Sequence, residues 1–182
     1  MSVVIAIKSK DRVYVGCDSR MSSEEGYYDS YISRPKAIKL DNGMIVAGVG
    51  NIGIVDILAD VAKNITNLNH DIVVTKIALP LFNKLSGTVM FSNGELDGAL
   101  LVAKDDKAFV ISSICTVEEI YNYNALGSGK YTALGSLYST CGIKDPEKRI
   151  VEAIKATGAS ILSVSSEAYV ADTKTNDFRK LA

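Results

Sequence analysis

Tryptophan is absent from this sequence, and histidine, cysteine and proline are scarce: there is one histidine, with three cysteines and three prolines. The lone histidine, His70 in NLNHD, argues against a Ser-His-Asp triad, because no nucleophile elbow accompanies it. One histidine and three scattered cysteines also make a poor zinc site, so we expect no bound metal. Cys17, Cys115 and Cys141 form no CxxC pair, and their odd number predicts free buried thiols in a reducing compartment.

The sequence also has no excess of charge of either sign and no long apolar run. Twenty basic residues against 21 acidic ones give a net charge of −1, which favours neither nucleic acid nor an anionic membrane as a partner. No apolar stretch approaches the ~20 residues of a membrane span. The first residues show neither the basic region nor the cleavage site of a signal peptide, so we expect a cytoplasmic protein.

What the sequence does have is ordinary globular composition and clear strand and helix patterns. Hydrophobic residues make up 47% of the 182 residues, and no linker or repeat interrupts them, so we expect one domain, 1–182. The apolar runs 3–7 and 12–17 flank a polar turn and predict a hairpin. A second hairpin is predicted over 36–40 and 44–49, around the turn sequence Asp41-Asn42-Gly43. Further strands are predicted at 88–92, 98–103, 107–113, 160–165 and 167–172, and a polar loop with some extended structure at 23–34.

Helical periodicity occupies the intervals between the strands. Apolar residues from Ile54 to Ile65 recur at helical spacing, and a second helix is predicted from Asp71, with Pro80 interrupting or kinking it. A third helix is expected from about 130 to 140. A fourth is expected with Asp145 as its N-cap, proline next, and Gly158 as its C-terminal cap. This order of strands, helices, strands, helices and strands predicts an α+β fold with antiparallel sheets covered by helices.

Five residues spread along the chain could carry chemistry together: Ser2, Asp18, Lys36, Gly48 and Ser128. Separately, each has an ordinary explanation, such as a turn cap, an exposed strand position, close packing, or a loop before a helix. The stretch GSGK at 127–130 does not match a phosphate-binding loop, since the required Ser/Thr after the lysine and the first glycine are both missing.

Taken together, the segments that hold these residues resemble the proteasome β-subunit and HslV branch of the N-terminal-nucleophile hydrolases. The stretch "CDSRMS" (17–22) is similar to the β-subunit "ADSRAT" segment, and "KAIKL" (36–40) to the strand that begins with the catalytic lysine. "IVAGVG" (45–50) resembles the segment with the oxyanion-hole glycine, and "ALGSGK" (125–130) the glycine-flanked serine before the third helix. The resemblance covers about residues 2–173 and implies the four-layer αββα sandwich of two antiparallel sheets flanked by helices.

The resemblance implies a nucleophile that supplies its own base. Once Met1 is removed, the free α-amine of Ser2 titrates near ~8 and can accept a proton from the neighbouring hydroxyl, so no histidine is needed. A Lys36 ammonium would favour the alkoxide, and Asp18 would compensate the charge of that lysine. A backbone N–H near Gly48 could approach the developing oxyanion because no side chain intervenes, and Ser128 would orient the amine.

The same resemblance implies the substrate-binding residues, the partners and one departure from the family. Met21 and Ser22 would line the substrate pocket. The family works as rings on polypeptide substrates, so a homo-oligomeric ring and an ATP-driven unfoldase partner are implied, with no cofactor. Serine stands here in place of the usual threonine, and Ser163 in place of an aspartate, with Ser165 or Ser166 at the following serine position.

Removal of Met1 separates the interpretations that remain open. A retained methionine would acylate the Ser2 amine and eliminate the general base. The leading hypothesis is a proteasome/HslV-type peptidase. A non-catalytic ring subunit of the same fold and an N-terminal-nucleophile amidase that acts on a small amide are the alternatives.

Overall fold

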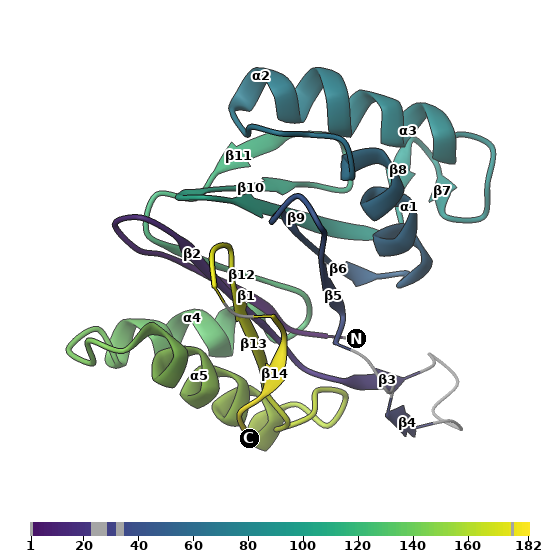
Figure 1. The fold of residues 1–182 in the computed structure, drawn as a ribbon. Helices are drawn as coiled ribbons and strands as arrows, with labels where there is room; N and C mark the ends of the chain where they lie inside the picture. Colours follow the sequence, from purple (N-terminus) through teal and green to yellow (C-terminus); the bar gives the residue numbers. More distant parts are fainter. Residues whose placement is uncertain (1, 23–28, 32–34, 176) are drawn as a thin grey trace.

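The computed structural model describes residues 2–22, 29–31, 35–175 and 177–182, and within them the chain forms four layers. Two five-stranded antiparallel sheets lie face to face. Helices α1 (Gly53–Ala62), α2 (His70–Ile72) and α3 (Leu79–Leu85) cover the outer face of one sheet, and α4 (Lys130–Ser139) and α5 (Pro146–Ser160) cover the outer face of the other (Figure 1). This is the αββα sandwich that the resemblance implies.

The first sheet has the strand order β12-β1-β2-β13-β14. Its predicted hairpin is confirmed as β1 (Val4–Lys8) and β2 (Val13–Cys17), which pair in a register that places Val4 opposite Cys17. β12 (Tyr123–Leu126) pairs on the far side of β1, and β13 (Tyr169–Asp172) pairs with β2. The edge strand β14 (Arg179–Lys180) and the strand β12 were not predicted.

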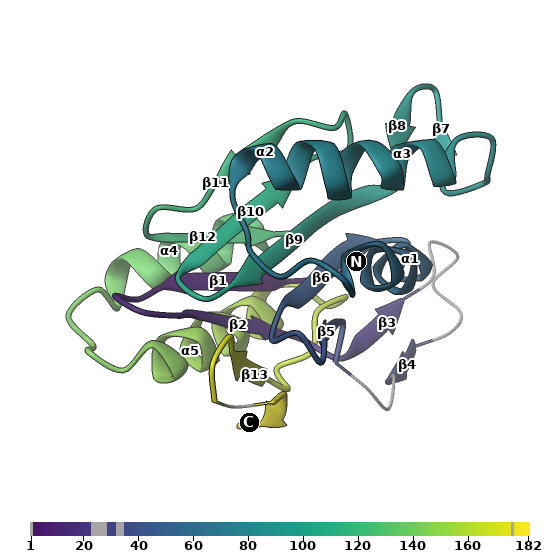
Figure 2. The ribbon, with the colours of Figure 1, turned by 45° about the horizontal axis from the view of Figure 1, so that its top comes forward.

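The second sheet has the order β11-β10-β9-β6-β5. β5 (Ala37–Lys39) and β6 (Ile45–Gly50) form the second predicted hairpin, and Gly43 takes the positive φ of +79° that its turn requires. β9 (Gly98–Lys104) and β10 (Lys107–Ile111) confirm the central strands, and β11 (Val117–Glu119) adds an unpredicted edge. Figure 2 shows β1 and β2 stacked against this sheet.

Two small antiparallel pairs lie outside the main sheets. β3 (Arg20–Ser22) pairs with β4 (Asp29–Tyr31), and β7 (Phe91–Ser92) pairs with β8 (Glu95–Leu96). The strand predicted at 88–92 is therefore reduced to its last two residues, and most of the predicted loop at 23–34 lies outside the described residues.

The helical layer over the second sheet begins with α1 (Gly53–Ala62) and continues as α2 (His70–Ile72), a π-helical turn η1 (Val73–Ala78) and α3 (Leu79–Leu85). The sequence predicted that Pro80 would kink or interrupt this run, and a π-helical turn does interrupt the α-helix there, with Pro80 in the first turn of α3. Proline cannot donate to the preceding turn, and the widened π turn just before it, where the Leu79 N–H donates to the Val74 carbonyl, takes up that change.

The opposite layer consists of α4 (Lys130–Ser139) and α5 (Pro146–Ser160). Asp145 is the N-cap of α5 as predicted, and its carboxylate accepts from the Glu147 and Lys148 amides. Gly158 is not the C-cap, because α5 continues to Ser160. The strand predicted at 160–165 was also wrong, since those residues end the helix and form a turn.

Gly158 has a different role, which concerns the segment that follows the helix. A Cβ on this residue would lie 2.7 Å from the Ser166 backbone nitrogen and 2.9 Å from the Ser165 carbonyl carbon. The glycine therefore allows the 163–167 segment to pack directly on α5, and a side chain there would displace it.

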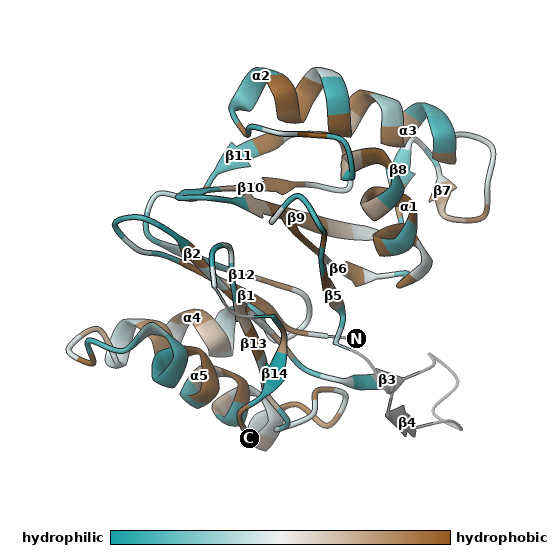
Figure 3. Cartoon of the chain, viewed as in Figure 1, coloured by the Kyte–Doolittle hydropathy of each residue, from teal (hydrophilic) through white to brown (hydrophobic). Residues whose placement is uncertain are grey.

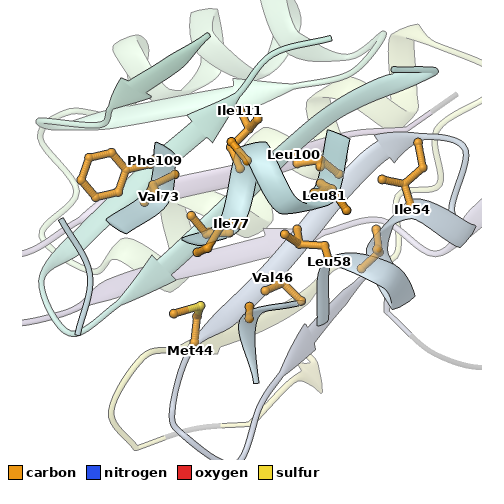
Figure 4. Close-up of a cluster of buried hydrophobic side chains, with 14 of the residues drawn as sticks. Met44, Val46, Ile54, Leu58, Val73, Ile77, Leu81, Leu100, Phe109 and Ile111 are labelled. Atoms are coloured by element: carbon orange, nitrogen blue, oxygen red, sulfur yellow. The ribbon is translucent and has the colours of Figure 1, made fainter. Parts of the chain in front are cut away.

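Three apolar clusters fill the three spaces between the four layers. Because side chains alternate along each strand, the outer face of each sheet packs into one cluster and the two inner faces share the third. Figure 3 shows the hydropathy of each residue along these strands and helices. The largest lies between the second sheet and its helices, where Ile54, Ile77 and Leu81 meet Leu100 and Val46 (Figure 4). No helix among the described residues is long and apolar enough to cross a membrane.

Candidate active site

Three of the residues predicted to act together meet at the end of the two sheets. The Lys36 Nζ lies 2.9 Å from the Ser2 Oγ and donates to both carboxylate oxygens of Asp18, each at 2.9 Å. All three side chains are buried: Ser2 is 6% exposed, Lys36 3% and Asp18 0%. A buried hydroxyl therefore lies against a buried cation with its own counter-ion.

The fold brings these residues together through two strand ends. Asp18 follows β2 immediately and, in the hairpin register, lies opposite Val3. Its backbone N–H donates to the Val3 carbonyl, at 3.3 Å, and its carboxylate accepts from the Val3 N–H at 3.0 Å. Lys36 immediately precedes β5 in the other sheet. The site therefore spans the two sheets, with the nucleophile candidate and the aspartate on one and the lysine on the other.

The Asp18 carboxylate is satisfied on both oxygens. Besides the two bonds from Lys36, it accepts backbone N–H groups of Val3, Arg20 and Ser165. Burial lowers the pKa of Lys36 from its usual value near 10.5, and the charge and hydrogen bonds of Asp18 oppose that shift in part. An ammonium in this position stabilises negative charge on the Ser2 oxygen that it contacts.

Cys17, predicted as a free buried thiol, is buried in the wall of this site, whereas the prediction of burial was wrong for the exposed Cys141. Burial, together with the charge of Asp18, raises the pKa of its thiol to about 12, although a backbone hydrogen bond from Lys36 opposes the shift in part. The Cys17 thiol therefore stays neutral and inert. The Lys36 backbone bonds to this thiol just outside the sheet, since the ladder between β5 and β6 ends at the next residue, with Ala37↔Ala47.

Gly48 lies on β6 one residue beyond the end of that ladder. The Leu40 N–H donates to the Met44 carbonyl, and the alternation of an antiparallel ladder then directs the Gly48 N–H toward the same edge, next to Lys36. The packing around Gly48 agrees with the ordinary explanation, close packing. A Cβ on this residue would lie 2.8 Å from Leu100 Cδ2 and 2.9 Å from Val55 Cγ2. Close packing under α1 therefore favours a residue without a side chain.

The glycine-flanked serine at 127–129 packs against the backbone of Ser2. Gly127 has φ +94°, and a Cβ on it would lie 2.1 Å from the Ser2 carbonyl oxygen. The Gly129 N–H donates to that oxygen at 3.4 Å, and the exposed Ser128 hydroxyl reaches it at 3.5 Å. The contact that the structure gives Ser128 is therefore with the carbonyl of Ser2, and its predicted contact with the amine stays a prediction.

Three predicted residues fall outside what the structure describes. Met21 and Ser22 lie on β3, but their side chains are outside the described part, and so is all of Met1.

Among the serines expected near the site, Ser165 contributes its backbone N–H to Asp18. The hydroxyl of Ser163 is buried and has no hydrogen-bond partner among the described residues.

One contributor to the site, Glu167, was not identified from the sequence. It accepts a hydrogen bond from Ser19 Oγ at 2.7 Å, and its own N–H donates to Ser165 Oγ at 2.9 Å. A lone glutamate in a polar segment carries no sequence signal of such a role, because its partner lies 148 residues away.

Across the described ranges, no three His, Cys, Asp or Glu residues gather as metal ligands would.

Comparison with known proteins identifies the family and the fold. The family model described as "Proteasome subunit" matches residues 2–174. No curated protein sequence matches the chain. Among solved structures, Thiobacillus denitrificans BPH in complex with epoxomicin superimposes with a TM-score of 0.77 at 19% identity, covering 99% of both chains.

Two further structures have the same fold at similarly low identity. Eukaryotic HslV from Trypanosoma brucei has a TM-score of 0.73 at 16% identity and covers 93% of this chain and 98% of its own. Anbu (ancestral beta-subunit) from Yersinia bercovieri has a TM-score of 0.70 at 15% identity, over 99% of this chain and 87% of its own. Because one family model spans almost the whole sequence and the fold agrees with it, this chain belongs to the proteasome subunit family.

Proposed function

We propose that this chain is a peptidase of the proteasome type in which Ser2, made N-terminal by removal of Met1, is the nucleophile. One observation carries the proposal: the Lys36 Nζ lies 2.9 Å from the Ser2 Oγ and 2.9 Å from each oxygen of Asp18, all of them buried. A solvent-exposed serine at a strand start would need no such neighbours. A buried cation against a hydroxyl is a means of making that hydroxyl reactive.

In the proposed reaction the neutral α-amine of Ser2 takes the hydroxyl proton while the oxygen attacks the peptide carbonyl. Lys36 stabilises the oxygen as it loses its proton, and Asp18 holds the lysine. The Gly48 N–H donates to the oxyanion, an interaction typically worth ~3 kcal/mol of transition-state stabilisation. The Ser2 ammonium then gives its proton to the departing amine, leaving an ester. Water, deprotonated by the regenerated amine, hydrolyses this ester and restores the serine.

The remaining roles belong to the same proposal. Ser128 orients the amine of Ser2, and Met21 and Ser22 line the pocket for the substrate side chain. The chain acts as one domain, 1–182, in a cytoplasmic homo-oligomeric ring, on polypeptides delivered by an ATP-driven unfoldase. No cofactor enters the reaction, because the nucleophile and its base are on one residue.

The test combines an intact mass with covalent labelling. We expect the mass of the purified chain to lack Met1, and a peptide epoxyketone or vinyl sulfone to label the N-terminal peptide. Ser2→Ala should lose the label. Ser2→Thr should keep it, because it preserves the hydroxyl and restricts its rotamer.

The other outcomes separate the alternative functions. A mass that includes Met1, with no Ser2-dependent label, would favour a non-catalytic ring subunit. Hydrolysis of a small amide without hydrolysis of casein would favour an amidase of the same fold.

A further inference from the structure

The turn that carries Asp18 and the 163–167 segment meet at this carboxylate. Asp18 Oδ2 accepts from the Arg20 N–H at 3.1 Å, within its own turn, and from the Ser165 N–H at 3.3 Å. These two amides and Lys36 fix the orientation of the carboxylate, and the carboxylate in turn fixes Lys36 against Ser2. Any residue that joins the two segments therefore acts on the position of the lysine.

Glu167 joins them directly. Its side chain accepts from the hydroxyl of Ser19, the residue that follows Asp18, at 2.7 Å. Its backbone N–H donates to the hydroxyl of Ser165 at 2.9 Å. Ser19 is fully buried, so its hydroxyl has no access to water as an alternative partner. Glu167 thus connects Ser19, which follows Asp18 in the chain, with Ser165, whose N–H donates to Asp18.

A separate set of contacts holds Glu167 itself. Its other carboxylate oxygen forms an ion pair with Lys180 on the edge strand β14. That strand pairs with β13, placing Lys180 opposite Tyr169, and the Leu181 N–H donates to the Ala168 carbonyl at 2.8 Å. The hydrogen bonds from Lys180 and Ser19 lower the pKa of Glu167, which keeps it ionised as their acceptor. The residues around 179–182 therefore support a contact that reaches the catalytic centre.

We propose that Glu167 is a positioning residue that aligns Asp18, and through it Lys36, by holding Ser19 and the 163–167 segment together. This inference rests on the proposed function, since it assigns Glu167 a part in the same reaction. Glu167 contacts neither Ser2 nor Lys36 in the described hydrogen bonds and ion pairs, so its effect on rate passes through Asp18.

Glu147, on α5, offers a matched control because it also pairs with a residue of β14. Arg179 Nη2 donates to both of its carboxylate oxygens, at 2.7 and 2.8 Å, and none of the hydrogen bonds described for Glu147 reaches the site. If the effect of losing Glu167 came only from a loosened β14, Glu147→Ala would reproduce it. If the effect comes from the Ser19 contact, Glu147→Ala leaves the site unchanged.

The experiment measures kcat and KM with a peptide substrate, and hydrogen–deuterium exchange at the Ser165 amide, for Glu167→Ala, Glu167→Gln, Ser19→Ala, the double alanine variant and Glu147→Ala. For Glu167→Ala we expect kcat to fall and the amide exchange rate to rise, each about tenfold, the scale of one lost hydrogen bond to a charged group, with KM little changed. Glu167→Gln keeps an acceptor for Ser19 and should retain most of the activity.

The double alanine variant should be no worse than either single variant, because both remove one shared contact. Ser19→Ala deletes a single oxygen and carries the test if Glu167→Ala does not fold. Effects that multiply in the double variant, or equal effects of Glu167→Ala and Glu147→Ala, would overturn the inference. If the wild-type chain has no Ser2-dependent turnover, the proposed function fails, and the exchange rate at Ser165 still decides this inference by itself.

Discussion

Replacing Lys36 with methionine removes the charge at the centre of the site while nearly preserving the shape of the side chain. Asp18 then remains as a buried carboxylate without a counter-ion. Breaking a buried pair in this way typically costs about 3–5 kcal/mol of unfolding free energy. Three backbone N–H groups still satisfy the carboxylate, so the cost should lie near the lower end of that range. Against a total of about 5–15 kcal/mol, this loss is large but measurable.

Urea unfolding of Lys36→Met, Asp18→Asn and the double variant checks the magnitude. Removing both charges leaves no unpaired ion, so the double variant should be more stable than the sum of the single effects predicts, by about 1–3 kcal/mol. Peptidase activity should be lost in all three variants. If Lys36→Met costs less than about 1 kcal/mol, or if the single effects simply add, the charges are not coupled in a buried pair and the reasoning about the site is wrong.

The pH dependence of the same variants follows from the lowered pKa of Lys36. In the folded chain this pKa lies below the unfolded value near 10.5, so between the two values the unfolded state binds more protons. Stability from this group therefore rises as the pH increases through that window, up to about 10.5. In Asp18→Asn the charge of Asp18, which raises the pKa of Lys36, is lost, and the rise should begin at lower pH. Lys36→Met should not show it.

Further predictions concern the glycine contact and the thiols. Gly127→Ala should destabilise the fold and abolish labelling of the nucleophile, because its Cβ would lie 2.1 Å from the Ser2 carbonyl oxygen at a φ of +94°. Gly135→Ala, on an exposed turn of α4 with nothing within 4 Å of the new Cβ, should instead raise the unfolding midpoint, since alanine is favoured by up to ~1 kcal/mol in a helix. Native thiol titration should modify the exposed Cys141 quickly and the buried Cys17 only after unfolding, because burial raises the pKa of Cys17 to about 12. Rapid modification of Cys17 in the folded chain would contradict the burial of the site.

Local sequence patterns predicted the parts of this fold that local forces decide. The β1–β2 hairpin, the turn before β6 and the Asp145 N-cap each depend on residues within a few positions of one another, and all were confirmed. Gly158 was misread because glycine near a helix end usually caps it, whereas here close contact with a distant segment requires it. The short edge strands were missed because pairing with the rest of the sheet, and not their own pattern, makes them strands.

The candidate site divides in the same way. Ser2, Asp18 and Lys36 were predicted to act together, and the structure brings them within hydrogen-bonding distance. Their grouping came from the resemblance of whole segments, since no single spacing indicates it. Glu167 could not be found from the sequence, because its meaning depends on a contact with Ser19 across the folded sheet.

The most direct test of the account is the mass of the N-terminal peptide after treatment of the native protein with a peptide epoxyketone. We predict a peptide that begins at Ser2 and carries the probe, and no adduct in Ser2→Ala. A peptide that still begins at Met1 and carries no probe, or an adduct that persists in Ser2→Ala, would contradict the claim that Ser2 is the nucleophile.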